Sequence, residues 1–457
     1  MRTRTWIALH PVATTLLLLP LFAAIGFGSL LINDRYVSGF IAVPLLYAIG
    51  LLWIRVSVAK DERPWLMKVC LVALGIRFIA SFGLEYLWSS FEGNSDGIAY
   101  GPHAAAIAQA WSRFGWTSYA DVVATPVGAP GYVYFSASIF WLFGYNTLYI
   151  KLINGLFAML SVVYTYKLGK YFFDEQVGRL STVVTAFMPS MILWTSQNLK
   201  DSMVVFLSMW ALWLASQGLR RGPFQLLMLG AVIAILATVR VETAIGLAII
   251  IALTFVFQLR SHLVIRVGAT VIGVIMLGFT LAYSGYGFLG RDFVERTLSV
   301  DAINAKREVT AYGGSAVASS GIDDSTVGLI TYLPQAATNF LLRPWPWEAT
   351  GSITQLMTIP ESLFIWYPLF GLSLIGLVFC WRKRPLQTSL LWVYVLAATV
   401  AAAPQYGNLG TAYRHRVQLW PCFFIFAAVG WYAWRDWRVQ RRNMQPTPQP
   451  KFVREGQ

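Results

Sequence analysis

The chain has 457 residues, of which 57% are hydrophobic and only 12% are charged, and its formal net charge is +14. Soluble domains carry about 25% charged residues, so this composition excludes an ordinary soluble enzyme and a disordered chain. The three cysteines lie in or beside apolar segments, which excludes a disulfide scaffold. The sequence therefore predicts an all-α polytopic membrane protein.

Apolar stretches of about 20 residues, the length that crosses a bilayer as a helix, recur along the chain. The first follows the basic residues Arg2 and Arg4 but is too long for a signal peptide, so we interpret it as an anchor. We predict about twelve transmembrane helices, at residues 12–33, 38–58, 65–88, 147–170, 178–196, 201–218, 223–239, 241–258, 264–285, 361–380, 387–404 and 416–434.

Residues 128–146 form a further apolar stretch, and the distribution of charge decides how it lies. If this stretch does not span and the amino terminus is cytoplasmic, most of the 35 Lys and Arg residues fall on the cytoplasmic side. If it spans, every later segment inverts and the basic residues divide almost evenly. The positive-inside rule favours the first topology. We therefore predict an interfacial helix on the outer face, with both termini cytoplasmic, and we attribute the net charge to topology rather than to nucleic acid.

This topology divides the chain into five parts. Two transmembrane helices occupy residues 1–64, and a larger module at 65–285 contains the first long outer segment, 89–146. The second long outer segment is 286–360, and the last spans and a basic cytoplasmic tail occupy 361–434 and 435–457. The cytoplasmic loops are short and contain no phosphate-binding Gly-rich motif. The polar chemistry is therefore expected on the outer face.

The first candidate site follows the third predicted span. Asp96, Tyr100 and His103 are spaced so that a helix would place them on one face. A carboxylate there can accept a proton from an incoming hydroxyl or amine. In the alternative interpretation, Asp96 is the amino-terminal cap of a helix.

Two pairs of charges interrupt the following spans on the outer side. Lys200 and Asp201 stand where the fifth span ends and the sixth begins, and Arg240 and Glu242 occupy the short turn between the seventh and eighth. Charges near membrane depth are costly and usually functional, so these residues are candidates for binding and orienting a phosphate. The alternatives are a helix cap, an interfacial lysine and an ion pair that satisfies itself.

Basic residues also enter the last span from the outer side, against the positive-inside trend. Arg414 and Arg416 are candidates for phosphate binding because arginine recognises phosphate oxygens in a bidentate way. Arg343, in the second outer segment, is a weaker candidate of the same kind. Arg77 lies within the third span with Glu85 two turns further along the same face, and we interpret this pair as structural or cavity-lining.

A carboxylate and several cationic residues are thus expected on one membrane surface. A base combined with phosphate-binding groups suits transfer of a group from a lipid phosphate. The four histidines and three cysteines show no metal-binding spacing. No cofactor is expected, although the sequence does not exclude a divalent metal held by acidic residues of the outer segments.

These features resemble the GT-C superfamily of polytopic membrane glycosyltransferases, which includes protein O-mannosyltransferases, lipid A aminoarabinose transferases and the RgtA/B/C/D-like bacterial group. The resemblance covers roughly residues 65–434. It rests on Asn94-Ser-Asp96-Gly-Ile-Ala-Tyr100, on Ser196-Gln-Asn-Leu-Lys-Asp201 and on the segment Asn408 to Pro421, which contains Tyr413-Arg-His-Arg416.

Two departures from the family pattern concern the donor and the acceptor more than the fold. The family often has two adjacent acids in the first motif, whereas Asp96 is followed by Gly97. Its paired prolines are split here into Pro126 and Pro130.

The resemblance implies an inverting transfer from a polyprenyl-phosphate-linked sugar on the outer face of a bacterial cytoplasmic membrane. Asp96 would be the base, while Arg240, Arg414 and Arg416 would bind the phosphate; Lys200 and Asp201 would shape the sugar or acceptor site. The acceptor is a glycan, a lipid or a protein. Three alternatives stay open: a surface polysaccharide polymerase or ligase that uses arginines of the second outer segment, a lipid-linked sugar transporter, and a scaffold for envelope assembly.

Overall fold

The computed structural model describes residues 35–87, 97–124, 128–217, 223–258, 299–311, 325–348 and 358–444. These ranges are helical and contain no strand, in agreement with the predicted all-α class. The amino-terminal half contains α2 (Arg35–Ser57), α3 (Arg63–Tyr86), α4 (Gly97–Phe114), α5 (Tyr119–Val122), α6 (Pro130–Phe143), α7 (Thr147–Phe172), α8 (Glu175–Phe187), α9 (Pro189–Thr195), α10 (Asp201–Gln217), α11 (Pro223–Val239) and α12 (Val241–Gln258). The carboxyl-terminal half contains α15 (Val300–Thr310), α16 (Thr326–Leu342), the π-helical turn η4 (Ser362–Trp366), α18 (Tyr367–Lys383), α19 (Ser389–Ala402), the 3₁₀ turn η5 (Ala403–Gln405), α20 (Leu409–Arg416) and α21 (Trp420–Met444).

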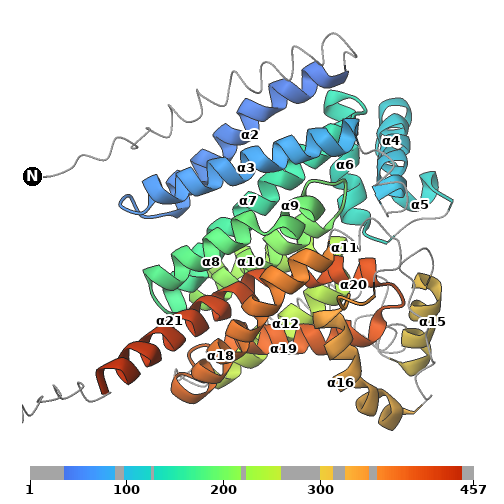
Figure 1. Ribbon diagram of the computed structural model, residues 1–457. Coiled ribbons are helices and arrows are strands. Elements are labelled where there is room, and N and C mark those ends of the chain that lie inside the picture. Colours follow the sequence, from blue (N-terminus) through green and yellow to red (C-terminus); the bar gives the residue numbers. More distant parts are fainter. Residues whose placement is uncertain are drawn as a thin grey trace, which may run out of the picture.

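The long helices lie side by side around α7 (Figure 1). α7 packs against α2, α3, α8 and α10, and 83% of its apolar 18-residue stretch is buried inside the protein. A helix that is apolar on every side needs such an enclosed position. The helices α4, α5 and α15 lie at one end of the bundle, whereas the carboxyl-terminal end of α21 lies at the opposite end (Figure 1).

Only part of the predicted set of spans is found among the described residues. Within the described residues, three helices are long and apolar enough to cross a membrane: Arg63–Tyr86, Thr147–Phe172 and Thr358–Lys383; the number rises to five if each of two bent helix pairs counts as one span. Four further predicted spans contain shorter apolar helices, at Ala42–Ser57, Phe224–Val239, Val241–Thr254 and Ser389–Gln405. The predicted spans at 12–33 and 264–285 lie outside the described residues. About twelve spans are therefore not confirmed.

The segment 128–146 forms α6, a helix of 14 residues that packs against α4. At 1.5 Å per residue this helix is shorter than the hydrocarbon core of a bilayer, which is about 30 Å thick. Trp141, Leu142 and Phe143 at its end are exposed. The length and the exposed aromatic end are those of a helix lying at an interface.

A proline breaks the predicted span 178–196. α8 and α9 meet at 57° around Met188 and Pro189. Pro189 has no N–H to donate, and the residue before a proline avoids the helical region; Met188 is accordingly extended, with φ −60° and ψ 121°. In a continuous helix the Ser190 N–H would donate to the Ala186 carbonyl, so the break leaves both groups in need of partners.

Two buried ionisable side chains supply these partners. Arg77 of α3 donates from Nη1 to the Ala186 carbonyl, over 2.9 Å. Glu361 accepts hydrogen bonds from the Ser190 N–H at 3.2 Å and from the Ser190 hydroxyl at 2.6 Å. Polar backbone groups at membrane depth require internal partners of this kind. Both charges therefore stabilise the broken span.

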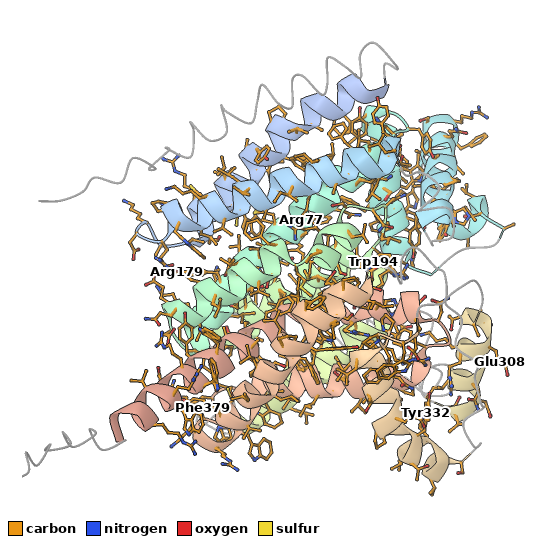
Figure 2. The ribbon with its side chains drawn as sticks, in the orientation of Figure 1. Arg77, Arg179, Trp194, Glu308, Tyr332 and Phe379 are labelled. Atoms are coloured by element: carbon orange, nitrogen blue, oxygen red, sulfur yellow. The ribbon has the colours of Figure 1, made fainter. Side chains whose placement is uncertain are left out.

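The partner of Arg77 differs from the one that helical spacing indicated. Glu85 instead pairs with Lys151 of α7, with 2.6 Å between the charged atoms. Arg77 also donates from Nε to the Thr195 hydroxyl, at 3.1 Å. Figure 2 shows Arg77 in the interior of the bundle, away from its outer surface. Arg77 is therefore structural, but it acts through α8 and α9 and not through Glu85.

α18 and α21 cross at a contact between two glycines. A Cβ on Gly376 would lie 2.0 Å from the Phe426 carbonyl oxygen, and a Cβ on Gly430 would lie 1.9 Å from the Leu372 carbonyl oxygen. Small residues let membrane helices approach closely enough for backbone packing. This crossing places α20, which precedes α21, beside the end of the bundle that holds the polar site.

Replacing Gly376 with alanine should lower the melting temperature of the purified protein, because overpacking costs about 1–3 kcal/mol. Gly371 on the same helix provides a matched control, since a Cβ there meets nothing within 4 Å. Gly371→Ala should keep or raise the melting temperature, because alanine is the better helix former. Equal melting temperatures for the two variants would contradict the close crossing.

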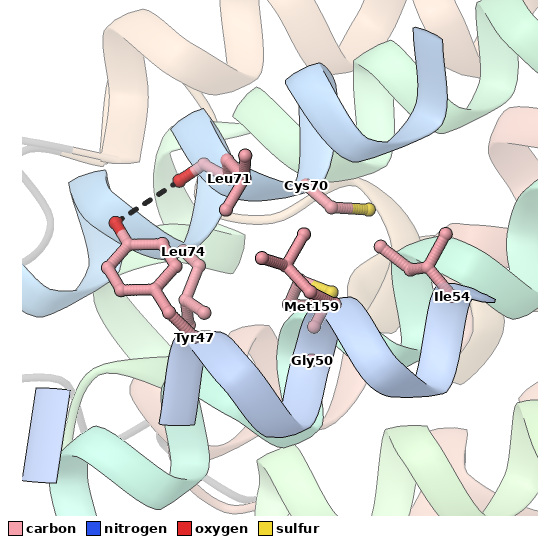
Figure 3. Close-up of a pocket in the computed structure, with 8 residues that line it drawn as sticks. Tyr47, Gly50, Ile54, Cys70, Leu71, Leu74 and Met159 are labelled. Atoms are coloured by element: carbon pink, nitrogen blue, oxygen red, sulfur yellow. Dashed lines mark hydrogen bonds between the residues drawn. The ribbon is translucent and has the colours of Figure 1, made fainter. Parts of the chain in front are cut away.

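A small pocket lies between α2, α3 and α7 (Figure 3). Its lining consists of Tyr47, Gly50, Leu51, Ile54, Cys70, Leu71, Leu74 and Met159. The Tyr47 hydroxyl donates to the Leu71 carbonyl at 3.3 Å. The lining contains no charged group, so the pocket is a packing feature and not a place for polar chemistry.

Candidate active site

The turn between α9 and α10 is held by an asparagine from the central helix. Asn154 of α7 is fully buried, and its Nδ2 donates to the carbonyls of Gln197 at 2.7 Å and Leu199 at 2.9 Å. A turn inside a helical bundle leaves carbonyls that only protein donors can satisfy. These hydrogen bonds fix the backbone immediately before Lys200 and Asp201.

The helices α4 and α6 contact the same turn. Tyr132 of α6 donates to Asn198 Oδ1 at 2.9 Å and packs edge-on against Tyr100 of α4, with 5.2 Å between the ring centroids. Lys200 lies over the Tyr100 ring, 6.0 Å from its centroid. The first outer segment is thereby joined to the turn that carries Lys200.

Asp201, the first residue of α10, is the centre of a buried polar cluster. It is only 1% exposed. Its Oδ1 accepts a hydrogen bond from Gln418 Nε2 at 2.7 Å and one from Arg240 Nη1 at 3.4 Å. Its Oδ2 lies 3.2 Å from Arg414 Nε. A buried carboxylate is tolerated only when such partners surround it, and this one holds two guanidinium groups from different parts of the chain.

His415 extends the cluster on the side of Arg240. The guanidinium Nη2 of Arg240 contacts His415 Nε2, and the Tyr406 hydroxyl lies 2.5 Å from His415 Nδ1. Burial raises the pKa of the Tyr406 hydroxyl, so this group stays protonated. Tyr406 stacks on Phe340 of α16, with 5.4 Å between the ring centroids.

Part of the second outer segment also reaches the cluster. Lys306 of α15 donates to Gln405 Oε1 at 2.7 Å, and its Nζ lies 3.6 Å from Glu242 Oε1. The Glu242 carboxylate follows Arg240 by two residues at the start of α12. Lys306 is therefore a cationic residue of the same surface.

A glycine in the loop before α20 allows α15 to pack closely against that loop. The Gly407 N–H donates to the Thr310 hydroxyl at 3.1 Å, and a Cβ on Gly407 would lie 2.0 Å from the Arg307 carbonyl oxygen. The Arg307 guanidinium lies over the ring of Tyr332, 4.9 Å from its centroid; Figure 2 shows Tyr332 beside this end of the bundle. A side chain at position 407 would displace α15 and Lys306 with it.

Arg416 lies one turn beyond the cluster and is fully buried. Its Nη2 donates to the Arg343 carbonyl at 2.5 Å, and its guanidinium lies 4.8 Å from the Tyr413 ring centroid. Its Nε and Nη1 have no hydrogen-bond partner within the described part of the chain. A buried guanidinium with two open donors is suited to bind an anion.

Two predicted site residues have their own partners elsewhere. The Arg343 guanidinium is paired with Glu348, with 2.6 Å between Nη2 and Oε1. His103 Nδ1 lies 2.9 Å from the Tyr119 hydroxyl, within the first outer segment. In this arrangement neither side chain contacts Asp201.

The structure thus brings five of the candidates into one cluster: Lys200, Asp201, Arg240, Glu242 and Arg414. Tyr100 contacts its edge through Lys200. Asp96 lies outside the described residues, immediately before α4 begins at Gly97.

Sequence reasoning missed several residues of the cluster. Asn154 and Gln418 lie in apolar stretches that were interpreted as spans, where an isolated amide is the available signal. His415 stands inside the Tyr413–Arg416 motif but was considered only as a metal ligand. Tyr406 and Lys306 carried no pattern that distinguished them.

No group of three or more His, Cys, Asp and Glu side chains is arranged to hold a metal ion in the described ranges. The cluster contains carboxylates, guanidinium groups, amines and one imidazole. Such a set can bind a phosphate and stabilise negative charge that develops on it.

A family model described as dolichyl-phosphate-mannose-protein mannosyltransferase matches residues 127–283. The matched segment contains α6 to α12, and with them Asn154, Asp201 and Arg240. It does not include Asp96, α15 or α20. No curated protein matches the chain. The match covers about a third of the 457-residue chain and agrees with the resemblance to membrane glycosyltransferases of the GT-C superfamily that the sequence motifs indicate.

Proposed function

We propose that the protein transfers a sugar, with inversion, from a polyprenyl-phosphate-linked donor to a glycan, lipid or protein acceptor on the outer face of a bacterial cytoplasmic membrane. Surface polysaccharide or glycoconjugate synthesis is the process that suits this reaction. The observation that carries the proposal is the pair of guanidinium groups, Arg240 and Arg414, held by the buried carboxylate of Asp201.

The charge balance of the cluster supports a phosphate as leaving group. Lys200, Arg240, Lys306 and Arg414 contribute positive charge, against the two carboxylates of Asp201 and Glu242. Within the described residues the cluster therefore has an excess of positive charge. A sugar phosphodiester carries one negative charge and becomes a dianion when the sugar leaves, so the excess is best matched after bond breaking. Stabilisation that grows along the reaction lowers the barrier.

In the proposed step, an acceptor oxygen attacks the anomeric carbon and forms the new glycosidic bond. The bond between that carbon and the phosphate oxygen breaks, and its electron pair stays on the phosphate. The proton of the acceptor hydroxyl goes to a carboxylate, which we assign to Asp96. Arg240 and Arg414 bind the departing phosphate, and Arg416 offers two further donors one turn away.

The apolar surface of the bundle supports a lipid-linked donor. Only 22% of the apolar 18-residue stretch of the span Thr358–Lys383 is buried inside the protein. Its exposed side chains include Phe364, Leu374 and Val378. Near its start this span contains Glu361 and the π-helical turn η4, and Glu361 lies close to Tyr413 and Arg416. A polyprenyl chain can lie along such a face while its phosphate reaches the arginines.

Charge at the two ends of the bundle supports action on the outer face. Exposed basic residues, among them Arg382, Arg435, Arg438 and Arg441, lie at the ends of α18 and α21. This end is opposite to α4, α5 and α15 (Figure 1). The positive-inside rule places the basic end in the cytoplasm, and hence the polar cluster on the outer side.

A panel of short-chain polyprenyl-phosphate sugars, incubated with the purified protein, tests this function. We expect release of free polyprenyl phosphate from at least one donor through slow transfer to water, and no reaction with soluble nucleotide sugars. Absence of release from every lipid donor, with the protein folded, would overturn the proposal and favour a transporter or a scaffold.

A further inference from the structure

The contacts of His415 are those of a neutral imidazole. A guanidinium group only donates hydrogen bonds, so the contact of Arg240 Nη2 with His415 Nε2 requires a lone pair on that nitrogen. The ring hydrogen then resides on Nδ1, which faces the Tyr406 hydroxyl. The imidazole therefore occupies a donor of Arg240 that a phosphate oxygen would otherwise accept.

Charged groups from every neighbouring element surround this imidazole. The positive charges of Arg240, Arg414, Lys200 and Lys306 all reach it. They come from the α11–α12 turn, α20, the α9–α10 turn and α15. The carboxylates near them are Asp201, which pairs with both arginines, and Glu242, which lies 3.6 Å from Lys306. Burial is the largest cause of the lowered pKa of His415, and these positive charges, which outnumber the carboxylates, lower the pKa further.

Binding of an anionic phosphate changes both the charge around His415 and the contact of its Nε2 with Arg240. The negative charge of the phosphate offsets part of the surrounding positive charge, and it attracts Arg240, which stays protonated and turns its donor from the imidazole to the phosphate. Nε2 of His415 is then free to carry a proton. We propose that His415 takes up one proton from solvent when the donor phosphate binds, and then donates a hydrogen bond to that phosphate.

This inference rests on the proposed function, because it needs a phosphate at the Arg240–Arg414 pair. The step is a proton transfer: an N–H bond forms at Nε2 of His415, and the bond of that proton to its carrier in the solvent breaks. The proton comes from bulk water, and the negative charge that retains it belongs to the bound phosphate. His415 is thus a further substrate-binding residue, and it links donor binding to pH.

The sign of the pH effect follows from linkage. Binding raises the proton affinity of His415, so the complex holds one more proton than the free protein. Affinity for the phosphate should therefore fall as pH rises, by up to about tenfold per pH unit, in the window where only the bound form is protonated. Outside that window the affinity should be independent of pH.

The probe is a short-chain prenyl methyl phosphodiester, which has one negative charge and does not itself titrate in the range used. Its binding to the full-length protein is measured by calorimetry between about pH 5 and about pH 8, where histidine titrates. Repeating the titration in two buffers of different ionisation enthalpy gives the number of protons taken up. We expect about one proton per ligand for the wild type.

Two variants locate the proton. His415→Gln retains an acceptor for Arg240 but cannot be protonated, so it should bind the probe with no proton uptake and no pH dependence. His262→Gln is the matched control, because the predicted topology places His262 in the cytoplasmic loop between the spans 241–258 and 264–285; its proton uptake should equal that of the wild type.

Probe binding to the wild type without proton uptake would overturn the role of His415 and leave the proposed function standing. Proton uptake that persists in His415→Gln would do the same. No binding of the probe to the wild type would overturn the phosphate site itself. The wild-type measurement in two buffers decides the question even if His415→Gln does not fold.

Discussion

Replacing Arg240 with glutamine should lower kcat/KM for the lipid-linked donor by about two to three orders of magnitude, the usual effect of removing one donor that stabilises transition-state charge. Arg240 is one of the two guanidinium groups held by Asp201. Glutamine can keep a hydrogen bond there but supplies no charge to the departing phosphate. The rate of polyprenyl phosphate release, measured against donor concentration, gives the value.

Arg179 is the matched control for this substitution. It lies on α8 in an ion pair with Glu175, 2.5 Å between the charged atoms, at the end of the bundle away from α15 (Figure 2). Arg179→Gln should leave kcat/KM unchanged. If Arg240→Gln behaves like Arg179→Gln, the phosphate is bound somewhere other than the Asp201 cluster.

Asp96→Asn should reduce transfer to the acceptor by about 10²–10⁴-fold, the range that general base catalysis contributes. An amide cannot accept the proton that the attacking hydroxyl loses. Donor binding should change much less than the rate, because the arginines of the cluster remain. Single-turnover transfer and probe affinity, measured on the same preparation, separate the two effects.

Asp121→Asn is the control in the same outer segment. Its carboxylate is exposed and accepts a hydrogen bond from Ser118 at 2.6 Å, so the substitution should leave transfer close to the wild-type rate. Equal rates for Asp96→Asn and the wild type would remove Asp96 from the mechanism. That result would favour a polymerase or ligase in which arginines of the second outer segment carry the chemistry.

Individual residues of the site were predictable because charge at a membrane boundary is costly and therefore conspicuous. Lys200, Asp201, Arg240, Glu242 and Arg414 all stand where a predicted span begins or ends. Sequence alone does not say which of these boundaries meet. The contact of Asp201 with Gln418 joins positions 217 residues apart, and that of Arg240 with His415 joins positions 175 residues apart.

Helical spacing was a weaker guide inside the bundle. It correctly put Arg77 and Glu85 on one helix, but the two do not pair with each other. Apart from the Ala73 carbonyl on the same helix, Arg77 contacts α8 and α9, and Glu85 contacts α7. Arg77 donates a hydrogen bond to the carbonyl that the break at Pro189 leaves without a helical partner, and Glu85 forms an ion pair with Lys151. Which neighbouring helix faces a buried charge depends on packing, and the period of a single helix contains no such information.

The predicted number of spans is not confirmed, in part for a related reason. Hydropathy counts apolar residues along the chain but does not register a bend. Pro189 divides one predicted span into α8 and α9, and a 62° bend separates α20 from α21. These breaks place Ser190, Tyr413 and Arg416 at helix ends inside the bundle. Irregular backbone at such depth is characteristic of binding sites in membrane proteins.

The proposed mechanism is tested most directly by determining which bond of the donor breaks and whether the anomeric carbon is inverted. The purified protein is incubated with its lipid-phosphate sugar in ¹⁸O-labelled water, and both products are analysed by mass spectrometry and the sugar also by its anomeric configuration. We predict that ¹⁸O enters the anomeric position of the released sugar, with inversion, and is absent from the polyprenyl phosphate. Label in the phosphate, or retained configuration, would contradict an inverting glycosyl transfer with phosphate as the leaving group.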